Sequence, residues 1–193
     1  GAYELFIYRF SSSSAADGAD VFDGRGGNDV FEGGAGDDSY TGGVGNDTFV
    51  VDATGDYIND TSGTDTIQTS TNYSLVNLAA IENLMTTSTA GTTNLTLWGN
   101  DSANQITGNA GNNIIDGKAG NDTMTGLAGN DVYFVDSASD SIVDSAGTDT
   151  VKASITYTLG ESVERLTLTG TDAIDGTGND VGNILRGNSA GNS

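Results

Sequence analysis

Residues 33–41 read GGAGDDSYT and residues 42–50 read GGVGNDTFV. Each block of nine opens with glycines, which leave the backbone free to make a tight turn with positive φ. The sixth place of each block is an Asp, and the eighth place is a strand-forming aromatic residue. A turn followed by a three-residue strand with one inward side chain predicts a coil of stacked, parallel strands, with blocks i and i+2 as neighbours about 4.8 Å apart.

The same phase holds through two runs of six blocks, 15–68 and 99–152, and starts again at 178–193. The eighth place is apolar or aromatic in all twelve blocks of the two runs. A disordered acidic chain, which the composition alone would allow, has no reason to keep this phase. The sixth places are Asp20, Asp29, Asp38, Asp47, Asp56 and Asp65 in the first run and Asn104, Asn113, Asp122, Asp131, Asp140 and Asp149 in the second.

A longer period relates the two runs, because Gly-Asn-Asp at 45–47 recurs at 129–131 and Ile81-Glu82 is answered by Val163-Glu164. The stretches 69–98 and 153–177 are rich in Thr, Leu and Val and lack a 3.6-residue apolar period, so they are expected to be irregular β connectors. Residues 1–14 are expected to add a capping strand. The expected domains are this cap, the ladders 15–68 and 99–152 with their connectors, and the start of a third, truncated ladder at 178–193. The chain is expected to be a piece of a longer protein.

Composition excludes several kinds of site. The 193 residues include 27 acidic and 6 basic side chains, a net charge of -21, and no Cys or His. Without His or Cys there is no Ser-His-Asp triad, thiolate nucleophile or ordinary zinc site. The charge argues against nucleic acid as a partner, because phosphate contacts need Lys and Arg. No targeting or membrane segment is visible, and no membrane insertion is expected.

The acidic columns require a counter-charge. Stacked blocks place their sixth-place carboxylates in a row, where they repel, and one apolar side chain per nine residues makes a thin core. Calcium accepts carboxylate and carbonyl oxygens in flexible geometry, whereas Mg²⁺ demands a tight octahedron. Metal binding and folding are therefore expected to be one event.

The alternative is that each Asp only caps its turn through side-chain-to-backbone bonds. This accounts for isolated Asp residues, but not for a column kept at every ninth position in a chain of this charge. The choice stays more open for the glycine-poor blocks 51–68 and 135–152, which either bind metal or close the coil.

The blocks 33–41 and 42–50 match the pattern Gly-Gly-x-Gly-x-Asp-x-apolar-x, so the chain resembles the RTX (repeats-in-toxin) calcium-binding proteins. The resemblance implies an all-β fold, a parallel β-roll or right-handed β-solenoid with calcium in its turns. It also implies that each ion lies between blocks i and i+2, bound by four carbonyls and two sixth-place side chains.

Carried over by resemblance, the first-run sites comprise Ala16, Gly18 and Asp20 with Gly33, Ala35 and Asp38, and Arg25, Gly27 and Asp29 with Gly42, Val44 and Asp47. The second-run sites comprise Asn100, Ser102 and Asn104 with Gly117, Ala119 and Asp122, and Asn109, Gly111 and Asn113 with Gly126, Ala128 and Asp131. Through the glycine-poor blocks, Asp38 pairs with Asp56, Asp47 with Asp65, Asp122 with Asp140, and Asp131 with Asp149.

Departures from the pattern lower the expected affinity of some sites. Asn104 and Asn113 supply an oxygen without charge, so their sites are expected to be weaker. Block 178–186 has no partner two blocks on and is expected to be incomplete. With four pairs per ladder, about eight calcium ions is the upper expectation.

Three functions are compatible with the sequence. The first is a non-catalytic calcium-dependent folding module of a bacterial protein exported by type I secretion and located outside the cell. The second is a calcium-dependent adhesin, surface-layer or polysaccharide-binding segment that uses exposed Thr, Ser and Asn rows and Trp98, which alternatively packs as a strand residue. The third is catalysis by carboxylates, which is disfavoured because no acid-base cluster is identified. Expected partners are therefore calcium, neighbouring domains, and a polysaccharide or cell-surface glycan.

Overall fold

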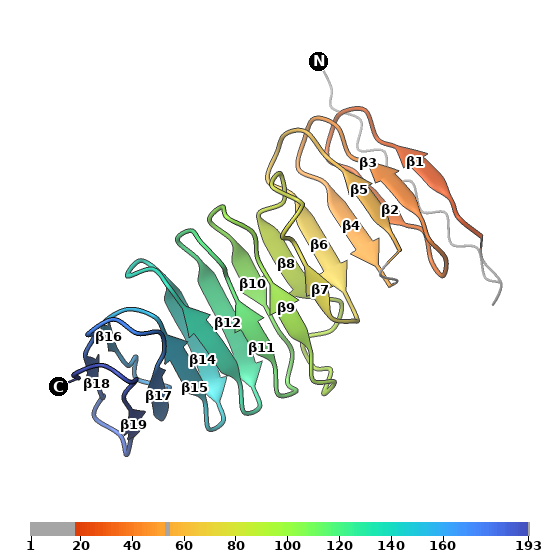
Figure 1. Cartoon of the computed structure of the whole chain (residues 1–193). Coiled ribbons are helices and arrows are strands. Elements are labelled where there is room, and N and C mark those ends of the chain that lie inside the picture. The colour runs from red at the N-terminus through yellow and green to blue at the C-terminus, as the bar shows by residue number, and fades with distance from the viewer. Residues whose placement is uncertain (1–17, 53–54, 193) are drawn as a thin grey trace.

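The structure is a computed structural model that describes residues 18–52 and 55–192, and the regular elements of these residues are all short β-strands. Strands with even and odd numbers alternate between two faces of one long coil (Figure 1). Every strand pair is parallel, as a coil that returns to the same face once per turn requires. The predicted parallel β-solenoid is confirmed.

Two seven-stranded sheets form most of the two faces. The even sheet contains β2 (Val30–Glu32), β4 (Thr48–Val51), β6 (Thr66–Thr69), β8 (Asn83–Thr86), β10 (Gln105–Thr107), β12 (Thr123–Ala128) and β14 (Ser141–Ala146). The odd sheet contains β7 (Tyr73–Ser74), β9 (Thr96–Trp98), β11 (Ile114–Asp116), β13 (Val132–Val135), β15 (Thr150–Ala153), β17 (Arg165–Leu168) and β19 (Ile184–Arg186). Two smaller sheets contain β1 (Val21–Asp23), β3 (Ser39–Thr41) and β5 (Tyr57–Asn59), and β16 (Tyr157–Thr158) and β18 (Gly176–Thr177).

The nine-residue period sets the register of the strands. Phe31 of β2 pairs with Phe49 of β4, and Tyr40 of β3 pairs with Ile58 of β5, so partners are two blocks apart in both faces. These eighth-place side chains are buried between the faces, because successive residues of a strand point to opposite sides. The rings of Phe31 and Phe49 stack with centroids 5.1 Å apart. The thin core is thus a row of inward-pointing side chains that runs along the coil.

The predicted connectors also contribute strands to the same sheets. Within residues 69–98, β8 pairs with both β6 and β10 of the even sheet, and β9 pairs with β11 of the odd sheet. The connector leucines Leu75, Leu84 and Leu97 are fully buried and continue the row of inward-pointing side chains. The core therefore passes from one ladder to the next through the connector.

Equivalent strands of the two runs lie in opposite sheets. Phe49 of β4 and Tyr133 of β13 occupy the same place in the longer period. The coil advances by nine strands from β4 to β13, which is an odd number of half-turns. Therefore β4 belongs to the even sheet and β13 to the odd sheet.

The described residues include the C-terminal end of the solenoid but not the predicted N-terminal cap. The predicted capping strand 1–14 lies outside the described residues. At the other end, β19 of block 178–186 pairs with β17 and extends the odd sheet. Among the described residues there is no helix with the length and apolarity needed to cross a membrane.

Candidate calcium sites

Backbone amides join the sixth-place side chains into ladders. In eight pairs the amide of a sixth-place residue donates to Oδ1 of the Asp two blocks later: Asp20 to Asp38 (2.9 Å), Asp29 to Asp47 (2.8 Å), Asp38 to Asp56 (3.0 Å), Asp47 to Asp65 (2.6 Å), Asn104 to Asp122 (2.8 Å), Asn113 to Asp131 (2.6 Å), Asp122 to Asp140 (3.1 Å) and Asp131 to Asp149 (2.7 Å). The structure thus brings together every predicted pair of sixth-place residues, although Asp20 itself is exposed.

The second carboxylate oxygen is the chemically unsatisfied group of the ladder. Among the described residues, a buried Oδ2 without a hydrogen-bond partner occurs at sixth-place residues Asp29, Asp47, Asp65, Asp122 and Asp131. A buried carboxylate oxygen without a donor or cation is costly. These oxygens are the hard donors that calcium prefers, so the residues present fit the metal.

First-place glycines keep the space in front of these oxygens open. A methyl group at Gly42 would lie 2.5 Å from Oδ2 of Asp47 and would overlap Oδ1 of Asp60. A methyl group at Gly117 would likewise overlap the carboxylate of Asp122. Any larger residue at either position would therefore fill the cradle beside the unsatisfied oxygens.

Within the described residues, two groups of three carboxylates form where a glycine-poor block stacks on a glycine-rich one. Asp47, Asp60 and Asp65 make one group, and Asp131, Asp144 and Asp149 make the other, with one oxygen of each residue within 4.8 Å of those of the other two. Asp60 also accepts the amide of Gly43 at 3.0 Å. Blocks 60–68 and 144–152 thus bring a carboxylate to the first place, where the glycine-rich blocks from 24 to 50 and from 99 to 134 have Gly.

Asp60 and Asp144 are not among the ligands predicted from the sequence. Both occupy the first place of a glycine-poor block, and they are separated by the same interval as the two copies of Gly-Asn-Asp. This recurrence was the available signal. It was missed because the family pattern places a glycine carbonyl, and not a side chain, at that position.

Burial and mutual repulsion make these carboxylates hold protons tightly in the metal-free chain. Burial, followed by interaction with the carboxyl group of Asp60 and then by the charge of Asp47, raises the pKa of Asp65 to about 7. Burial and the carboxylate of Asp149 raise the pKa of Asp144 to about 8. Burial is also the main cause that raises the pKa of Asp122 and of Asp131 to about 6. A bound divalent cation would favour the charged forms instead.

Glutamates continue both ladders into the connectors. The amide of Asp65 donates to Oε2 of Glu82 at 2.9 Å, and the amide of Asp149 donates to Oε2 of Glu164 at 2.9 Å. Ile/Val-Glu recurs at these positions in the sequence, but neither Glu is among the predicted ligands. The longer side chain spans the irregular spacing of a connector, where no sixth-place Asp is available.

The remaining predicted side-chain ligands differ in whether their oxygens already have hydrogen-bond partners. Asp140 uses both carboxylate oxygens, since its Oδ1 accepts the amide of Asp122 and its Oδ2 accepts the amides of Asp136 (3.2 Å) and Ser137 (3.1 Å). Ala16 lies outside the described residues. Asn104 and Asn113 are buried in the ladder.

The predicted carbonyl ligands lie in turns that stack on one another. The amide of Val44 donates to the carbonyl of Arg25 at 3.2 Å, and the carbonyl of Val44 accepts the amide of Gly27 at 2.7 Å. Each such carbonyl retains a second lone pair. Ligation by these carbonyls, and by the carbonyls predicted in the other blocks, stays a prediction.

Comparison with known proteins agrees with this geometry. The family model of the RTX calcium-binding nonapeptide repeat matches residues 14–49 and 98–133, with four copies. No curated protein and no solved structure gives a significant match. The repeat module of this family is non-catalytic. Together with the stacked acidic turns, the match identifies residues 14–49 and 98–133 as RTX calcium-binding nonapeptide repeats in tandem, built into a β-roll.

Proposed function

We propose that this module is a calcium-dependent folding segment of a larger bacterial protein that crosses the envelope unfolded by type I secretion and folds outside the cell. The observation that carries the proposal is the set of buried Oδ2 atoms without a partner, in particular those of Asp47, Asp65 and Asp131. Their desolvation opposes folding until a cation is bound.

The physical chemistry of the two compartments supports this proposal. At low free calcium, a chain with a net charge of -21 repels itself and stays expanded. Extracellular modules of this kind bind calcium in the range of roughly 10⁻⁴–10⁻³ M, so millimolar calcium fills them. Ion binding outside the cell then supplies the free energy that the thin core lacks.

Circular dichroism of the chain in excess EDTA, followed by titration with calcium, tests the proposal. We expect a disordered spectrum in EDTA and a cooperative rise of the β-sheet signal with added calcium. Magnesium at the same concentration serves as the matched control and is expected to have little effect, because it resists irregular coordination. A β-sheet signal of full amplitude in EDTA near pH 8, where the carboxylates are ionised, would contradict the proposal.

A second candidate function is binding of an acidic polysaccharide, favoured by one face of the solenoid. The outward side chains of the odd sheet and its turns include four of the six basic residues: Lys118, Lys152, Arg165 and Arg186. Together with the aromatic residues Trp98 and Phe134 they form a surface that we call the cationic face. The strands of the even sheet contain no Lys or Arg. Positive charge is thus concentrated on one side of an acidic chain.

Aromatic rings lie among these cations. Lys118 Nζ lies 4.9 Å from the ring centroid of Trp98, and Lys152 Nζ lies 4.9 Å from that of Phe134. Trp98 is 42% exposed and borders a groove of about 550 Å³ that Tyr73 and Thr96 also line. Sugar rings stack on such aromatics while carboxylates or sulfates of a linear glycan meet the cations.

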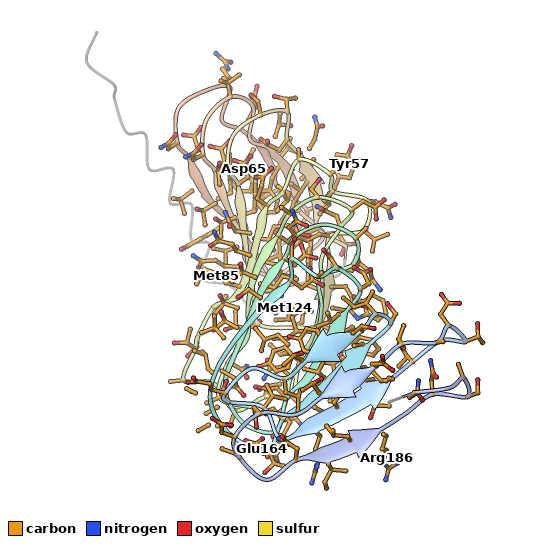
Figure 2. The ribbon with its side chains drawn as sticks, turned by 90° about the vertical axis from the view of Figure 1, so that its left-hand side faces the viewer. Tyr57, Asp65, Met85, Met124, Glu164 and Arg186 are labelled. Atoms are coloured by element: carbon orange, nitrogen blue, oxygen red, sulfur yellow. The ribbon has the colours of Figure 1, made fainter. Side chains whose placement is uncertain are left out.

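Figure 2 shows Arg186 at the outer surface of the last strand, in contrast to Met124 inside the coil. Arg165 and Arg186 are exposed, and within the described residues neither forms an ion pair. These two arginines therefore remain available to an anionic ligand.

Affinity electrophoresis of the calcium-loaded chain in gels containing alginate or dextran tests this second function. We expect alginate alone to retard the protein, and the double variant R165Q/R186Q to lose the retardation. The double variant Q68E/Q105E changes the net charge by the same amount on the even sheet and should keep it. Equal mobility of all three proteins in alginate would contradict glycan binding without affecting the calcium proposal.

A further inference from the structure

Four blocks carry asparagine at both the second and the sixth place, and we call their turns the asparagine turns: 100–104, 109–113, 179–183 and 188–192. In each turn the second-place Oδ1 accepts the amide of the residue two positions later. The bonds are Ser102 to Asn100 (2.8 Å), Gly111 to Asn109 (2.8 Å), Val181 to Asn179 (3.1 Å) and Ala190 to Asn188 (2.9 Å). The turn is thus closed by its own side chain.

The sixth-place amide nitrogen occupies the position expected for a cation. Nδ2 of Asn113 donates to Oδ1 of Asn109 (3.1 Å), to the carbonyl of Asn109 (3.3 Å) and to the carbonyl of Gly111. These two carbonyls, at places two and four, are those predicted to ligate calcium together with Asn113. Because carbonyls only accept hydrogen bonds, their convergence demands either a cation or an N–H donor.

The sixth-place amide nitrogen of Asn104 is also paired with carbonyls, here those of the first connector. Nδ2 of Asn104 donates to the carbonyls of Ile81 (3.2 Å) and Glu82 (3.3 Å). Its Oδ1 accepts the amide of Asn100 at 2.8 Å, so the side chain uses both ends within the protein. No buried oxygen is left over, in contrast to Asp65 and Asp131.

Backbone conformation separates the two kinds of turn independently of the side chains. In the aspartate turns of blocks 24–32, 33–41, 42–50, 117–125 and 126–134, the fourth-place glycines have positive φ, as at Gly45 (138°) and Gly120 (134°). In the asparagine turns, no described residue at the second or fourth place has positive φ. Even Gly111, which could adopt positive φ without strain, does not. The carbonyls of the two kinds of turn are therefore oriented differently.

The second-place amides also hold the connectors. Nδ2 of Asn100 donates to the carbonyls of Leu78 (2.8 Å) and Ile81 (2.9 Å). Nδ2 of Asn179 likewise donates to the carbonyl of Val163 at 2.9 Å and to that of Gly160. Asparagine turns thus occur where the preceding coil is a connector whose carbonyls accept the side-chain amides of the turn.

We infer that the asparagine turns bind no calcium and that their amide nitrogens replace the metal. This inference rests on the proposed calcium function of the aspartate turns. It divides the ions into two groups, one between Asp20 and Asp65 and one between Asp122 and Asp149, joined by a metal-free stretch. Without the two pairs that involve Asn104 and Asn113, the expected number of ions falls from about eight to about six.

Isothermal titration calorimetry of the full chain, with variants at two sixth places, tests the inference. Asn113→Ala is expected to bind the same number of calcium ions as the wild type but to melt at a lower temperature in saturating calcium. Asp131→Asn, the control from the same column, is expected to bind at least one ion fewer. Loss of one ion in Asn113→Ala would overturn the inference.

The wild-type ion count keeps the inference falsifiable if Asn113→Ala does not fold. About six ions support it, and about eight overturn it. Failure of the proposed function gives a different result. A folded wild type that produces no calcium-binding heat would contradict both the proposed function and the inference. Normal calcium binding by the wild type, with one ion lost in Asn113→Ala, would contradict only the inference.

Discussion

The backbone amide of Asp47 donates a 2.6 Å hydrogen bond to Oδ1 of Asp65, while Oδ2 of Asp65 is buried without a partner. One carboxylate thus connects two coils through its first oxygen and requires a cation at its second. This division explains how a repeat with one inward apolar side chain can build a long, regular solenoid. Backbone hydrogen bonds fix the register, and the metal removes the penalty that the same carboxylates create.

Replacing Asp65 by Asn tests the role of the second oxygen. Asp65→Asn keeps an acceptor for the amide of Asp47 but removes a negative charge from the ladder. We expect the calcium concentration at half-folding to rise by about tenfold or more, roughly 1.4 kcal/mol, measured by circular dichroism. Asp101→Asn, an exposed change outside the column, is the control and should leave the midpoint unchanged. Equal midpoints for both variants would contradict the role given to Asp65.

The three-carboxylate groups predict a pair of sites with higher affinity than the rest. Asp144→Asn removes one carboxylate from the group with Asp131 and Asp149, so the tightest phase of a calcium titration should weaken. Terbium luminescence sensitised by tyrosine and tryptophan can resolve this phase. Asp172→Asn, an exposed substitution, should leave it intact. An unchanged tight phase in Asp144→Asn would mean that Asp144 is not a ligand.

Protons should replace calcium at low pH. The pKa of Asp65, about 7, and that of Asp144, about 8, lie above the ordinary Asp value of 3.8, so the folded metal-free chain binds more protons than the unfolded chain. This stabilisation is fully present below about pH 4 and is lost as the pH rises through about 6–8. We expect an EDTA-treated chain to gain β-sheet signal near pH 4 and to lose it near pH 8. A disordered chain at both pH values would contradict the assigned burial.

Gly45 provides a test of backbone conformation. Its φ is 138°, and a Cβ there would overlap the carbonyl oxygen of Gly27. Gly45→Ala should therefore lower stability in saturating calcium by more than about 1 kcal/mol, seen as a lower melting temperature. Gly182→Ala is the matched control, because nothing lies within 4 Å of its Cβ position and its φ is not positive. Similar melting temperatures for both variants would contradict the turn geometry.

The repeating part of the fold could be predicted from the sequence because one physical unit recurs. Sixth-place Asp and eighth-place apolar residues fix the turn, the strand and the stacking of blocks two apart, as the pairing of Phe31 with Phe49 shows. The path of the connectors could not be predicted in the same way. Thr66 pairs with Asn83, and Asn83 pairs with Gln105, but neither separation equals two blocks and the two differ from each other, so no fixed period indicates their sheets.

The chemistry of the sites could be predicted only in part. Column Asp residues were recognisable because a regular row of carboxylates has no stable state without a cation. Asn113 was different, since its side chain offers an oxygen for a metal or an N–H for carbonyls, and only the surrounding backbone decides which one is used. Asp60 and Glu82 were missed because they substitute for a backbone carbonyl and for an Asp, respectively.

The placement of β4 and β13 in opposite sheets has a geometric consequence for longer arrays of the same unit. One unit of the longer period advances the coil by nine strands, which is four and a half turns, so each copy is rotated by half a revolution relative to the previous one. Features repeated once per unit would alternate between opposite sides of the rod, and copies on the same side would recur after nine turns, or about 43 Å. Such a filament would present two identical stripes to its surroundings, with a spacing set by the backbone alone.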